Sequence, residues 1–118
     1  MPLLHIHSSP KTVNEKVIQE VHQVGAQILS EELGKSTDYV MVLVNTGSSL
    51  SFAQDDQTPC AYLEVKNIGG FTPKTTEELS LRLCELVNQK LQTPANRVYI
   101  EFQNAERYLW GWNGKTFA

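Results

Sequence analysis

The nitrogen of Pro2 is the most distinctive chemical group in this sequence, because Pro2 directly follows the initiator Met1. Removal of Met1 would turn that nitrogen into a free secondary amine, a group that no other residue of the chain can provide. An amine can act as a general base when its pKa lies near the working pH. The structural alternative is that Pro2 only begins a strand, a position where proline is tolerated.

A second pattern is His5-Ile6-His7, in which both imidazoles lie on the same face of an extended segment. Two histidines at this spacing are potential metal ligands, but zinc sites use three or four protein ligands. The remaining histidine, His22, falls in a predicted helix, and the sequence shows no clear third ligand. We therefore predict no metal site and no cofactor.

The two cysteines, Cys60 and Cys84, lie far apart in the sequence and form no CxxC motif. This spacing gives no support for a redox or zinc motif, and we expect both to be reduced thiols in a cytosolic protein. Cys84 falls on an apolar helical stripe, which predicts a small core residue.

The composition excludes several classes of function. The chain has 118 residues, 41% of them hydrophobic, and we expect a single domain over residues 1–118 with one core. The net charge of −3 comes without any Lys/Arg run, so we expect no nucleic-acid partner. No apolar run has the length of a membrane span and no signal peptide is recognisable, so we expect a cytoplasmic protein with no membrane partner.

Two helices must help to position these groups. Apolar residues recur at the spacing of one helix face in two runs, which are Val13, Val17, Val21, Val24 and Ile28, and then Leu79, Leu83, Leu86 or Val87, and Leu91. Capping boxes predict where the helices begin, Thr12 with Glu15 and Thr75 with Glu78. Gly34 predicts the end of the first helix, with Lys35 just beyond it.

Extended, mainly apolar runs predict strands over residues 3–7, 39–44, 60–66 and 97–102. Residues 46–59 are polar and predict a loop with a short turn around Leu50 and Phe52. In the tail, Asn113-Gly114 predicts a hairpin turn. The nearby Trp110 and Trp112 favour packing and subunit contact over a ligand-binding role.

The chain also repeats itself. Pro10-Lys11-Thr12 recurs as Pro73-Lys74-Thr75, whereas Val40 corresponds to Val98 at a smaller offset. The second offset is smaller by five, which predicts that the second helix and its turn are shorter than the first by that amount. Each half reads strand, helix, strand, with parallel strands and a right-handed crossover. We therefore predict an α/β (α+β) fold, in which two pseudo-symmetric βαβ repeats form a four-stranded sheet with two helices on one face.

This architecture leaves the other face of the sheet without helices. The run Tyr39–Val44 is apolar on both faces, like a strand that is buried on both sides. An uncovered apolar sheet face predicts a partner surface, and self-association into a symmetric ring or dimer is the simplest hypothesis.

Several motifs together resemble the tautomerase superfamily, and specifically its branch of macrophage migration inhibitory factor and D-dopachrome tautomerase. The resemblance runs from end to end of the chain. It rests on Met1-Pro2, Leu33-Gly34-Lys35, Pro59-Cys60-Ala61, Ile68-Gly69, Arg97-Val98-Tyr99-Ile100 and the closing run Gly111-Trp112-Asn113-Gly114-Lys115-Thr116-Phe117-Ala118.

The resemblance implies a tautomerase/MIF fold that assembles as a homotrimer, with active sites at the subunit boundaries. It implies keto–enol tautomerisation of phenylpyruvate-like 2-keto acids and of dopachrome derivatives, without a cofactor or metal. Pro2 is then the catalytic base, and Lys35, Ile68 and Tyr99 bind the substrate, Tyr99 from a neighbouring subunit. Lys35 also fits an ordinary solvated lysine, Ile68 a core residue, and Tyr99 a structural contact.

Glu101 departs from the family pattern, because the mammalian cytokine has a substrate-binding asparagine at this position. A carboxylate there would raise the pKa of the Pro2 amine and repel an anionic substrate. It would alternatively pair with Lys35 or donate a proton to a different substrate. Cys60 likewise lacks the CxxC partner of that cytokine, so thiol–disulfide oxidoreductase activity is not expected. The alternative function is a signalling or interaction protein with vestigial catalysis, and leaderless secretion in the family leaves an extracellular role open.

Overall fold

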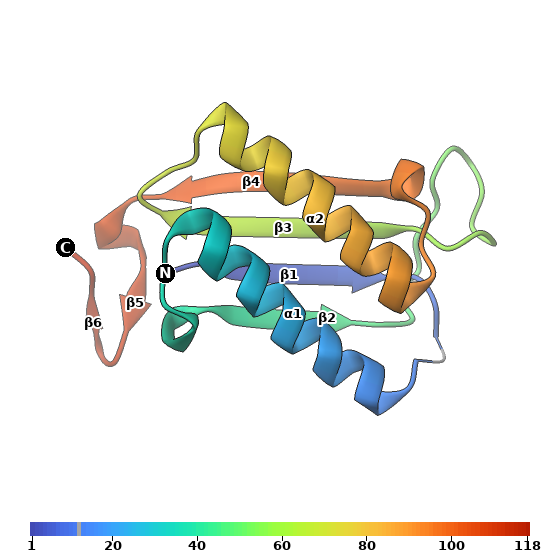
Figure 1. Ribbon diagram of the computed structural model, residues 1–118, viewed down its shortest axis with the longest axis horizontal. Helices are drawn as coiled ribbons and strands as arrows, with labels where there is room; N and C mark the ends of the chain where they lie inside the picture. The colour runs from blue at the N-terminus through green and yellow to red at the C-terminus, as the bar shows by residue number, and fades with distance from the viewer. Residues whose placement is uncertain (12) are drawn as a thin grey trace.

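Two helices pack on one face of a four-stranded sheet in the computed structural model of the chain, which describes residues 1–11 and 13–118 (Figure 1). The helices are α1 (Glu15–Leu33) and α2 (Pro73–Leu91), and the main strands are β1 (Leu3–Ser8), β2 (Met41–Asn45), β3 (Ala61–Ile68) and β4 (Val98–Ala105). Three single 3-10 turns, η1 (Thr37–Tyr39), η2 (Ala95–Arg97) and η3 (Arg107–Leu109), and a hairpin of β5 (Gly111–Trp112) and β6 (Lys115–Thr116) complete the described elements.

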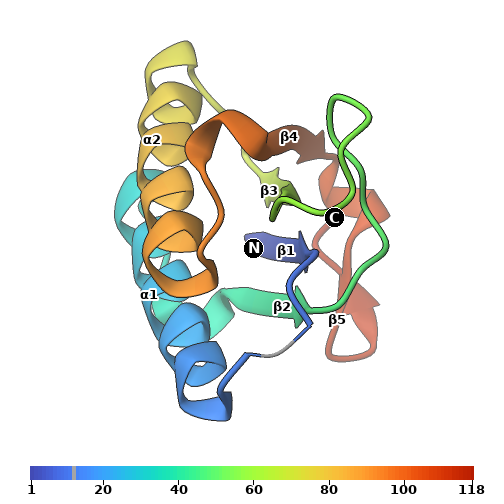
Figure 2. The ribbon, with the colours of Figure 1, turned by 90° about the vertical axis from the view of Figure 1, so that its right-hand side faces the viewer.

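The sheet has the strand order β2-β1-β3-β4. Strands β1 and β2 are parallel, β3 and β4 are parallel, and the two central strands β1 and β3 are antiparallel. Both helices cover the same face, whereas the tail and the loop before β3 project on the other side (Figure 2). The predicted fold class of two βαβ repeats in one four-stranded sheet is confirmed.

The repeat is more regular than its sequence signature. Strands β1 and β3, helices α1 and α2, and turns η1 and η2 all begin at the same offset, at residues 3 and 61, 15 and 73, and 37 and 95. Both helices contain 19 residues, so the prediction of a shorter second helix is wrong. The tripeptide match misleads because Pro73 opens α2, whereas Pro10 lies in the loop before α1.

The helix starts also differ from the predicted capping boxes. Thr12, one half of the first box, lies outside the described residues. Asn14 caps α1, and its side chain accepts a hydrogen bond of 2.8 Å from the backbone N–H of Lys16. Thr72 caps α2, three residues before the predicted Thr75, and Pro73 occupies the first helical position. Proline favours that position because its fixed φ already suits a helix and its missing N–H has no partner to lose there.

The core lies between the helices and the sheet. Leu4 and Ile6 of β1 face it and are fully buried, together with Leu63 and Val65 of β3. The second helical stripe is confirmed, because every residue in it is buried. In the first helix the buried line turns toward Gly25 and Leu29, so that Val24 remains 40% exposed. Within the described part of the chain, no helix combines the length and apolarity needed to cross a lipid bilayer.

The two cysteines differ in burial. Cys60 is buried at the start of β3, whereas Cys84 of α2 is only half-buried and therefore not part of the central core that was predicted for it. Burial raises the pKa of the Cys84 thiol. Both thiols are free.

The face of the sheet opposite the helices is only partly apolar. On edge strand β2, Met41 and Leu43 are 66% and 45% exposed, so the prediction of a strand buried on both faces is wrong for the single chain. On the central strands the same face carries polar side chains, which include His5, His7 and Glu64. We name this surface, on the strand faces turned away from α1 and α2, the open face.

Candidate active site

Pro2 lies at the start of β1 and its side chain is fully buried. The backbone N–H of Met41 donates a hydrogen bond of 3.1 Å to the Pro2 carbonyl, which anchors Pro2 beside the start of β2. The chain therefore holds the residue after Met1 in a defined place instead of leaving it in a frayed terminus.

A pocket of about 470 Å³ opens beside Pro2. Its walls come from three segments, namely the first residues of the chain, the stretch from η1 into β2, and the tail. The lining residues are Met1, Pro2, Leu3, Asp38, Tyr39, Val40, Met41, Trp110, Gly111, Trp112 and Phe117. Most of these side chains are aromatic or aliphatic, which suits a ligand that has a ring or another apolar body.

Aromatic contacts shape one wall of this pocket. Tyr39 meets Trp112 edge-on with ring centroids 5.9 Å apart, and Trp112 stacks on Phe117 with centroids 6.1 Å apart. The tail hairpin turns at Asn113-Gly114, where both φ angles are positive, as the sequence predicted. This turn brings the tail tryptophans to the pocket, so they contribute to the site as well as to packing.

Lys35 and Ile68 meet beside Met1. A smaller pocket of about 120 Å³ is lined by Met1, Lys35, Ile68, Arg107 and Phe117, and it shares Met1 and Phe117 with the larger pocket. Lys35 follows Gly34, which ends α1 in the left-handed conformation with φ 65°. The structure thus brings three of the five predicted site residues, Pro2, Lys35 and Ile68, to one end of the sheet.

Gly69 allows the Lys35 side chain to come close to the backbone. A Cβ built on Gly69 would lie 3.6 Å from the Lys35 Nζ, and Gly69 has a φ of +105°, which side chains rarely adopt. The Ile68-Gly69 pair therefore contributes a strand end and an adjoining space that a larger residue would fill.

The electrostatic environment lowers the basicity of an amine at this end of the chain. Burial lowers the pKa of the Met1 α-amino group, and the nearby Lys35 ammonium lowers it further. Both effects favour the neutral form of the amine over its positively charged form.

Arg107 is a pocket residue that the sequence pattern did not reveal. Its Nε donates a hydrogen bond of 2.9 Å to the Phe117 carbonyl, which ties η3 to the end of the tail. Arg107 and Lys35 line the same small pocket and place two cations beside Met1. Arg107 begins the short 3-10 turn η3 after β4, where no periodicity indicates what a side chain will contact.

Tyr99 and Glu101 lie elsewhere in the same chain. Tyr99 pairs with Tyr62 of β3, which pairs with His7 of β1, so Tyr99 is level with a residue five positions beyond Pro2. Five strand residues span roughly 16 Å along the strand direction. Strand β4 also lies two strand spacings away from β1 across the sheet, which increases the distance between Tyr99 and Pro2. Glu101 is one step nearer on the same face, and both side chains are exposed. A single chain therefore does not bring Tyr99 or Glu101 to Pro2.

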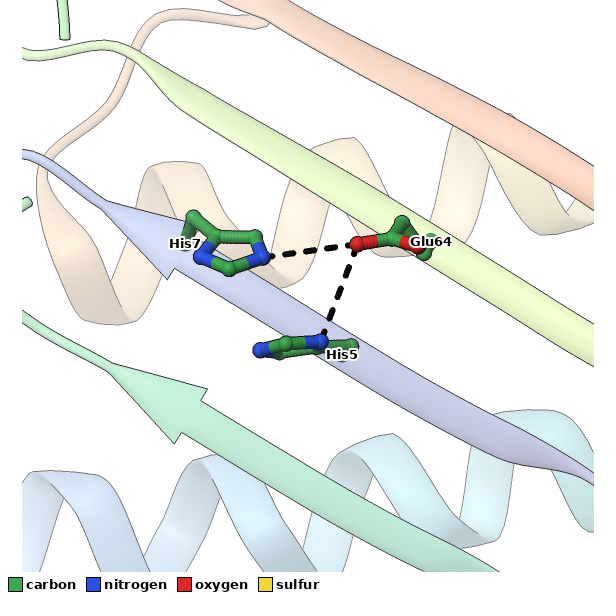
Figure 3. Close-up of side chains that lie close together, drawn as sticks. All are labelled: His5, His7 and Glu64. Atoms are coloured by element: carbon green, nitrogen blue, oxygen red, sulfur yellow. Dashed lines mark ion pairs between the residues drawn. The ribbon is translucent and has the colours of Figure 1, made fainter.

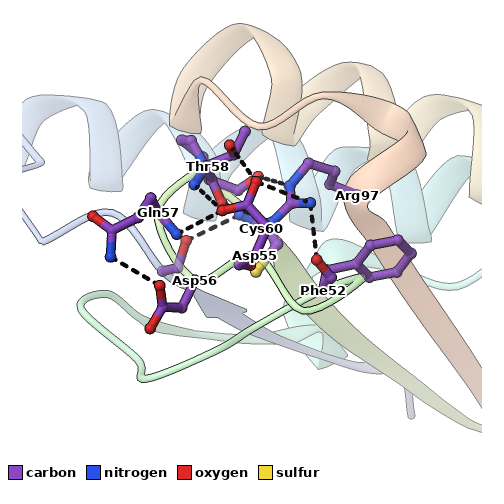
Figure 4. A network of polar contacts seen from close by, with 9 residues as sticks. Phe52, Asp55, Asp56, Gln57, Thr58, Cys60 and Arg97 are labelled. Atoms are coloured by element: carbon purple, nitrogen blue, oxygen red, sulfur yellow. Dashed lines mark hydrogen bonds and ion pairs between the residues drawn. The ribbon is translucent and has the colours of Figure 1, made fainter.

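An ordered loop supports Tyr99 at its end of the sheet. The Tyr99 ring meets Phe52 edge-on with centroids 5.1 Å apart. Arg97 holds this loop by donating hydrogen bonds of 2.9–3.1 Å to four backbone carbonyls, those of Phe52, Asp55, Thr58 and Pro59 (Figure 4).

Asp55 organises the same loop from within. Its carboxylate accepts hydrogen bonds from the Thr58 hydroxyl and from the backbone N–H groups of Gln57 and Thr58. These bonds, with a smaller contribution from Arg97, lower the pKa of Asp55 to about 2. The predicted loop over residues 46–59 is thus confirmed, with its turn closed by a bridge between Phe52 and Asp55.

Comparisons with known proteins match this arrangement over the whole chain. The family model described as Macrophage migration inhibitory factor (MIF) matches residues 1–118. The chain is 32% identical over 117 residues to a macrophage migration inhibitory factor homolog of Trichinella spiralis, a match that covers 99% of this chain and 100% of the relative. It is 33% identical over 92 residues to the macrophage migration inhibitory factor of Xenopus tropicalis, 78% of this chain and 79% of the relative.

The solved structures agree. The crystal structure of a macrophage migration inhibitory factor homologue from Prochlorococcus marinus has a TM-score of 0.88 and 36% identity, and the match covers 98% of this chain and 99% of that one. Because the family model matches residues 1–118 and the Trichinella spiralis relative covers 99% of the chain, the protein belongs to the macrophage migration inhibitory factor family of the tautomerase superfamily.

Proposed function

We propose that the protein is a keto–enol tautomerase of phenylpyruvate-like 2-keto acids, with the Pro2 nitrogen as general base after removal of Met1. The observation that carries this proposal is the place of Pro2, which is buried at the edge of an apolar pocket with Lys35 and Ile68 close to its neighbour Met1. Family membership supports a tautomerase-like activity in general, and the pocket supports this substrate class.

The reaction moves one proton within the substrate. The Pro2 nitrogen takes a proton from the carbon next to the keto group, and the electrons of that C–H bond form the carbon–carbon double bond. The carbonyl oxygen then receives the proton from the Pro2 ammonium, which restores the free amine and yields the enol. Burial and the Lys35 ammonium lower the pKa of the Met1 α-amino group one residue away, and we expect the same two effects to favour the unprotonated Pro2 amine that the first step requires.

The two pockets suit the two ends of such a substrate. Lys35 and Arg107 supply positive charge for the carboxylate, and arginine can bind a carboxylate through two parallel hydrogen bonds. Tyr39, Trp112 and Phe117 offer aromatic surface for the phenyl ring, and dopachrome-type substrates present a ring and a carboxylate in the same way.

The proposal includes a homotrimer. Tyr99 and Glu101 are far from Pro2 within one chain, so as site residues they would come from a neighbouring subunit. Exposed apolar residues on the edge strand, Met41 and Leu43, favour such an assembly. Sedimentation of dilute protein tests this part of the proposal, and a stable 13.3 kDa monomer would contradict it.

A second candidate function is signalling or interaction with weak catalysis, and Glu101 is the observation that favours it. Its negative charge opposes both an unprotonated Pro2 amine and an anionic substrate.

The deciding experiment combines intact-mass analysis with a phenylpyruvate enol–keto assay on the native protein and on Pro2→Gly. We expect the mass of a chain without Met1 and loss of most activity in the variant. A retained Met1, or a Pro2→Gly variant as active as the parent, would exclude Pro2 as the base. Absence of tautomerase activity in the native protein as well as in Pro2→Gly would instead favour the interaction function.

A further inference from the structure

We propose that His5, His7 and Glu64 form a binding site for a divalent transition-metal ion, with zinc as the expected occupant. The sequence shows only two of these ligands, because Glu64 comes from another strand. The three ligand atoms lie within 4.8 Å of one another in the folded chain. All three side chains project from the central strands onto the open face (Figure 3).

The strand register assembles the three ligands. His5 of β1 pairs directly with Glu64 of β3, and antiparallel pairing puts directly opposed side chains on the same face. His7 lies two residues beyond His5 and therefore on that face as well. Leu4 and Ile6, which flank His5 in β1, point into the core. Both imidazoles are therefore directed to the open face.

The distances suit tetrahedral coordination. Glu64 Oε1 lies 3.7 Å from His5 Nδ1 and 3.4 Å from His7 Nε2. Zinc ligands about 2.0–2.1 Å from the metal at tetrahedral angles are about 3.3 Å apart. The ligand atoms of His5 and His7 lie within 4.8 Å of each other, so metal binding requires side-chain rotations that bring the three atoms closer together. Two imidazoles and one carboxylate, with a water molecule in the fourth position, are a ligand set that zinc uses in proteins.

The surroundings support this ligand set. The Asn45 amide nitrogen, Nδ2, lies 3.0 Å from His5 Nε2, the ring nitrogen that would not bind the metal, so a metal-binding His5 requires the amide to be flipped. With the amide oxygen turned toward the ring, Asn45 can accept the Nε2–H, the kind of contact that orients metal-binding histidines. Lys66 approaches the other carboxylate oxygen, Oε2, at 3.8 Å, and leaves Oε1 directed at the imidazoles.

The local charge and exposure also favour a cation. Glu101 of β4 pairs with Glu64 in the sheet. The negative charge of Glu101 therefore offsets the positive charge of Lys66. With neutral imidazoles the cluster keeps a net charge of −1. The three ligand side chains are 22–27% exposed, which lets an ion enter from solvent without a change of fold.

The test is calorimetric titration of Zn²⁺ into protein that has been stripped with a chelator. We expect one ion per chain, and at least tenfold weaker binding in His7→Asn and in Glu64→Gln, since even residues outside the ligand shell typically change affinity 10–100-fold. His22→Asn is the matched control, because it removes a histidine on α1, away from the cluster, and should bind as the parent does.

Two further measurements distinguish loss of the metal site from loss of the fold. Circular dichroism of each variant shows whether the sheet is intact, and Zn²⁺ should raise the Tm of the parent more than that of Glu64→Gln. Stoichiometry far below one ion per chain overturns the proposal, and so does parent-like affinity in a folded His7→Asn or Glu64→Gln variant. Pro2→Gly should keep full Zn²⁺ binding, which separates this site from the tautomerase site.

Discussion

At the scale of single residues, the carboxylate of Glu101 is the side chain most expected to limit the proposed reaction. Replacement by asparagine removes a negative charge that would face the Pro2 amine and the substrate across a subunit boundary. We predict that Glu101→Asn raises phenylpyruvate turnover at neutral pH by up to about tenfold, the effect of one pKa unit on the unprotonated amine. Steady-state kinetics measure this change.

The control for that variant is Glu77→Gln, which removes an exposed carboxylate on α2, on the helix side of the sheet. Its turnover should equal that of the parent. Unchanged or lower turnover in Glu101→Asn would show that the carboxylate is tolerated or useful, and would turn attention to substrates to which it donates a proton.

Lys35 is expected to set the pH at which the base becomes active. Its charge lowers the pKa of an amine at this end of the chain, after the larger effect of burial. In Lys35→Met that pKa rises, so the amine is protonated up to a higher pH. We predict that the acidic limb of the pH profile of kcat/KM shifts to higher pH and that KM increases.

Lys74→Met serves as the comparison, because Lys74 is an exposed lysine in the first turn of α2. The two profiles should differ only for Lys35→Met. An acidic limb that stays in place would mean that burial alone controls the amine and that Lys35 acts only on the substrate.

Residue patterns predicted part of the site. Pro2 stood out through its chemistry, and Lys35 and Ile68 through the family resemblance, and the structure places them at two adjoining pockets that share Met1 and Phe117, while their role in the site stays a prediction. Arg107 and Glu64 were missed for a physical reason, since each becomes informative only when the fold brings it to partners distant in sequence. Glu64 is an ordinary strand residue until the antiparallel register sets it opposite His5.

At the scale of elements, the loop over residues 46–59 depends on one guanidinium group. Arg97 binds four backbone carbonyls and also lies over the Phe52 ring, 5.5 Å from its centroid. Lysine keeps the charge but cannot reproduce the planar fork of donors. We predict that Arg97→Lys accelerates amide hydrogen exchange in this loop and lowers activity, because Phe52 supports Tyr99.

Arg82→Lys is the matched substitution for this test. Arg82 links the two helices through Glu31 and Glu32 on the opposite side of the sheet. Its replacement should leave exchange in the loop unchanged. Equal exchange in the parent and in Arg97→Lys would mean that Asp55 and the Phe52–Asp55 bridge hold the loop without Arg97.

Element order was predictable, whereas element boundaries were not. Apolar periodicity located both helices and all four main strands, because burial of one face imposes that pattern. The capping box at Thr75 failed because Thr72 followed by Pro73 starts the helix one turn earlier, and a local pattern cannot rank two competing starts. The repeat length failed for a related reason, since the matching tripeptides occupy different places in the two halves.

At the scale of the whole molecule, a site shared between subunits can be tested by mixing inactive variants. Pro2→Gly lacks the base, and Tyr99→Ala lacks the aromatic from the neighbour. Co-refolded in equal amounts, they should form trimers in which about a quarter of the sites combine an intact Pro2 with an intact Tyr99. We predict about a quarter of the parent's activity from the mixture and little from either variant alone.

The corresponding control is a mixture of the same variants without unfolding and refolding. It should stay inactive as long as the subunits do not exchange. Activity of the refolded mixture no higher than the mean of the two variants would show that Pro2 and Tyr99 do not serve one site.

The open face has a consequence for the interior of such an assembly. Its central band is polar, with His5, His7, Glu64 and Lys66, whereas edge strand β2 is apolar. Closed around a threefold axis, β2 would form dry contacts and the band would line a hydrated passage. Small ions and water would then reach the centre of the trimer without any subunit separating, and substitutions along that passage would change its charge while leaving the stability of the fold largely intact.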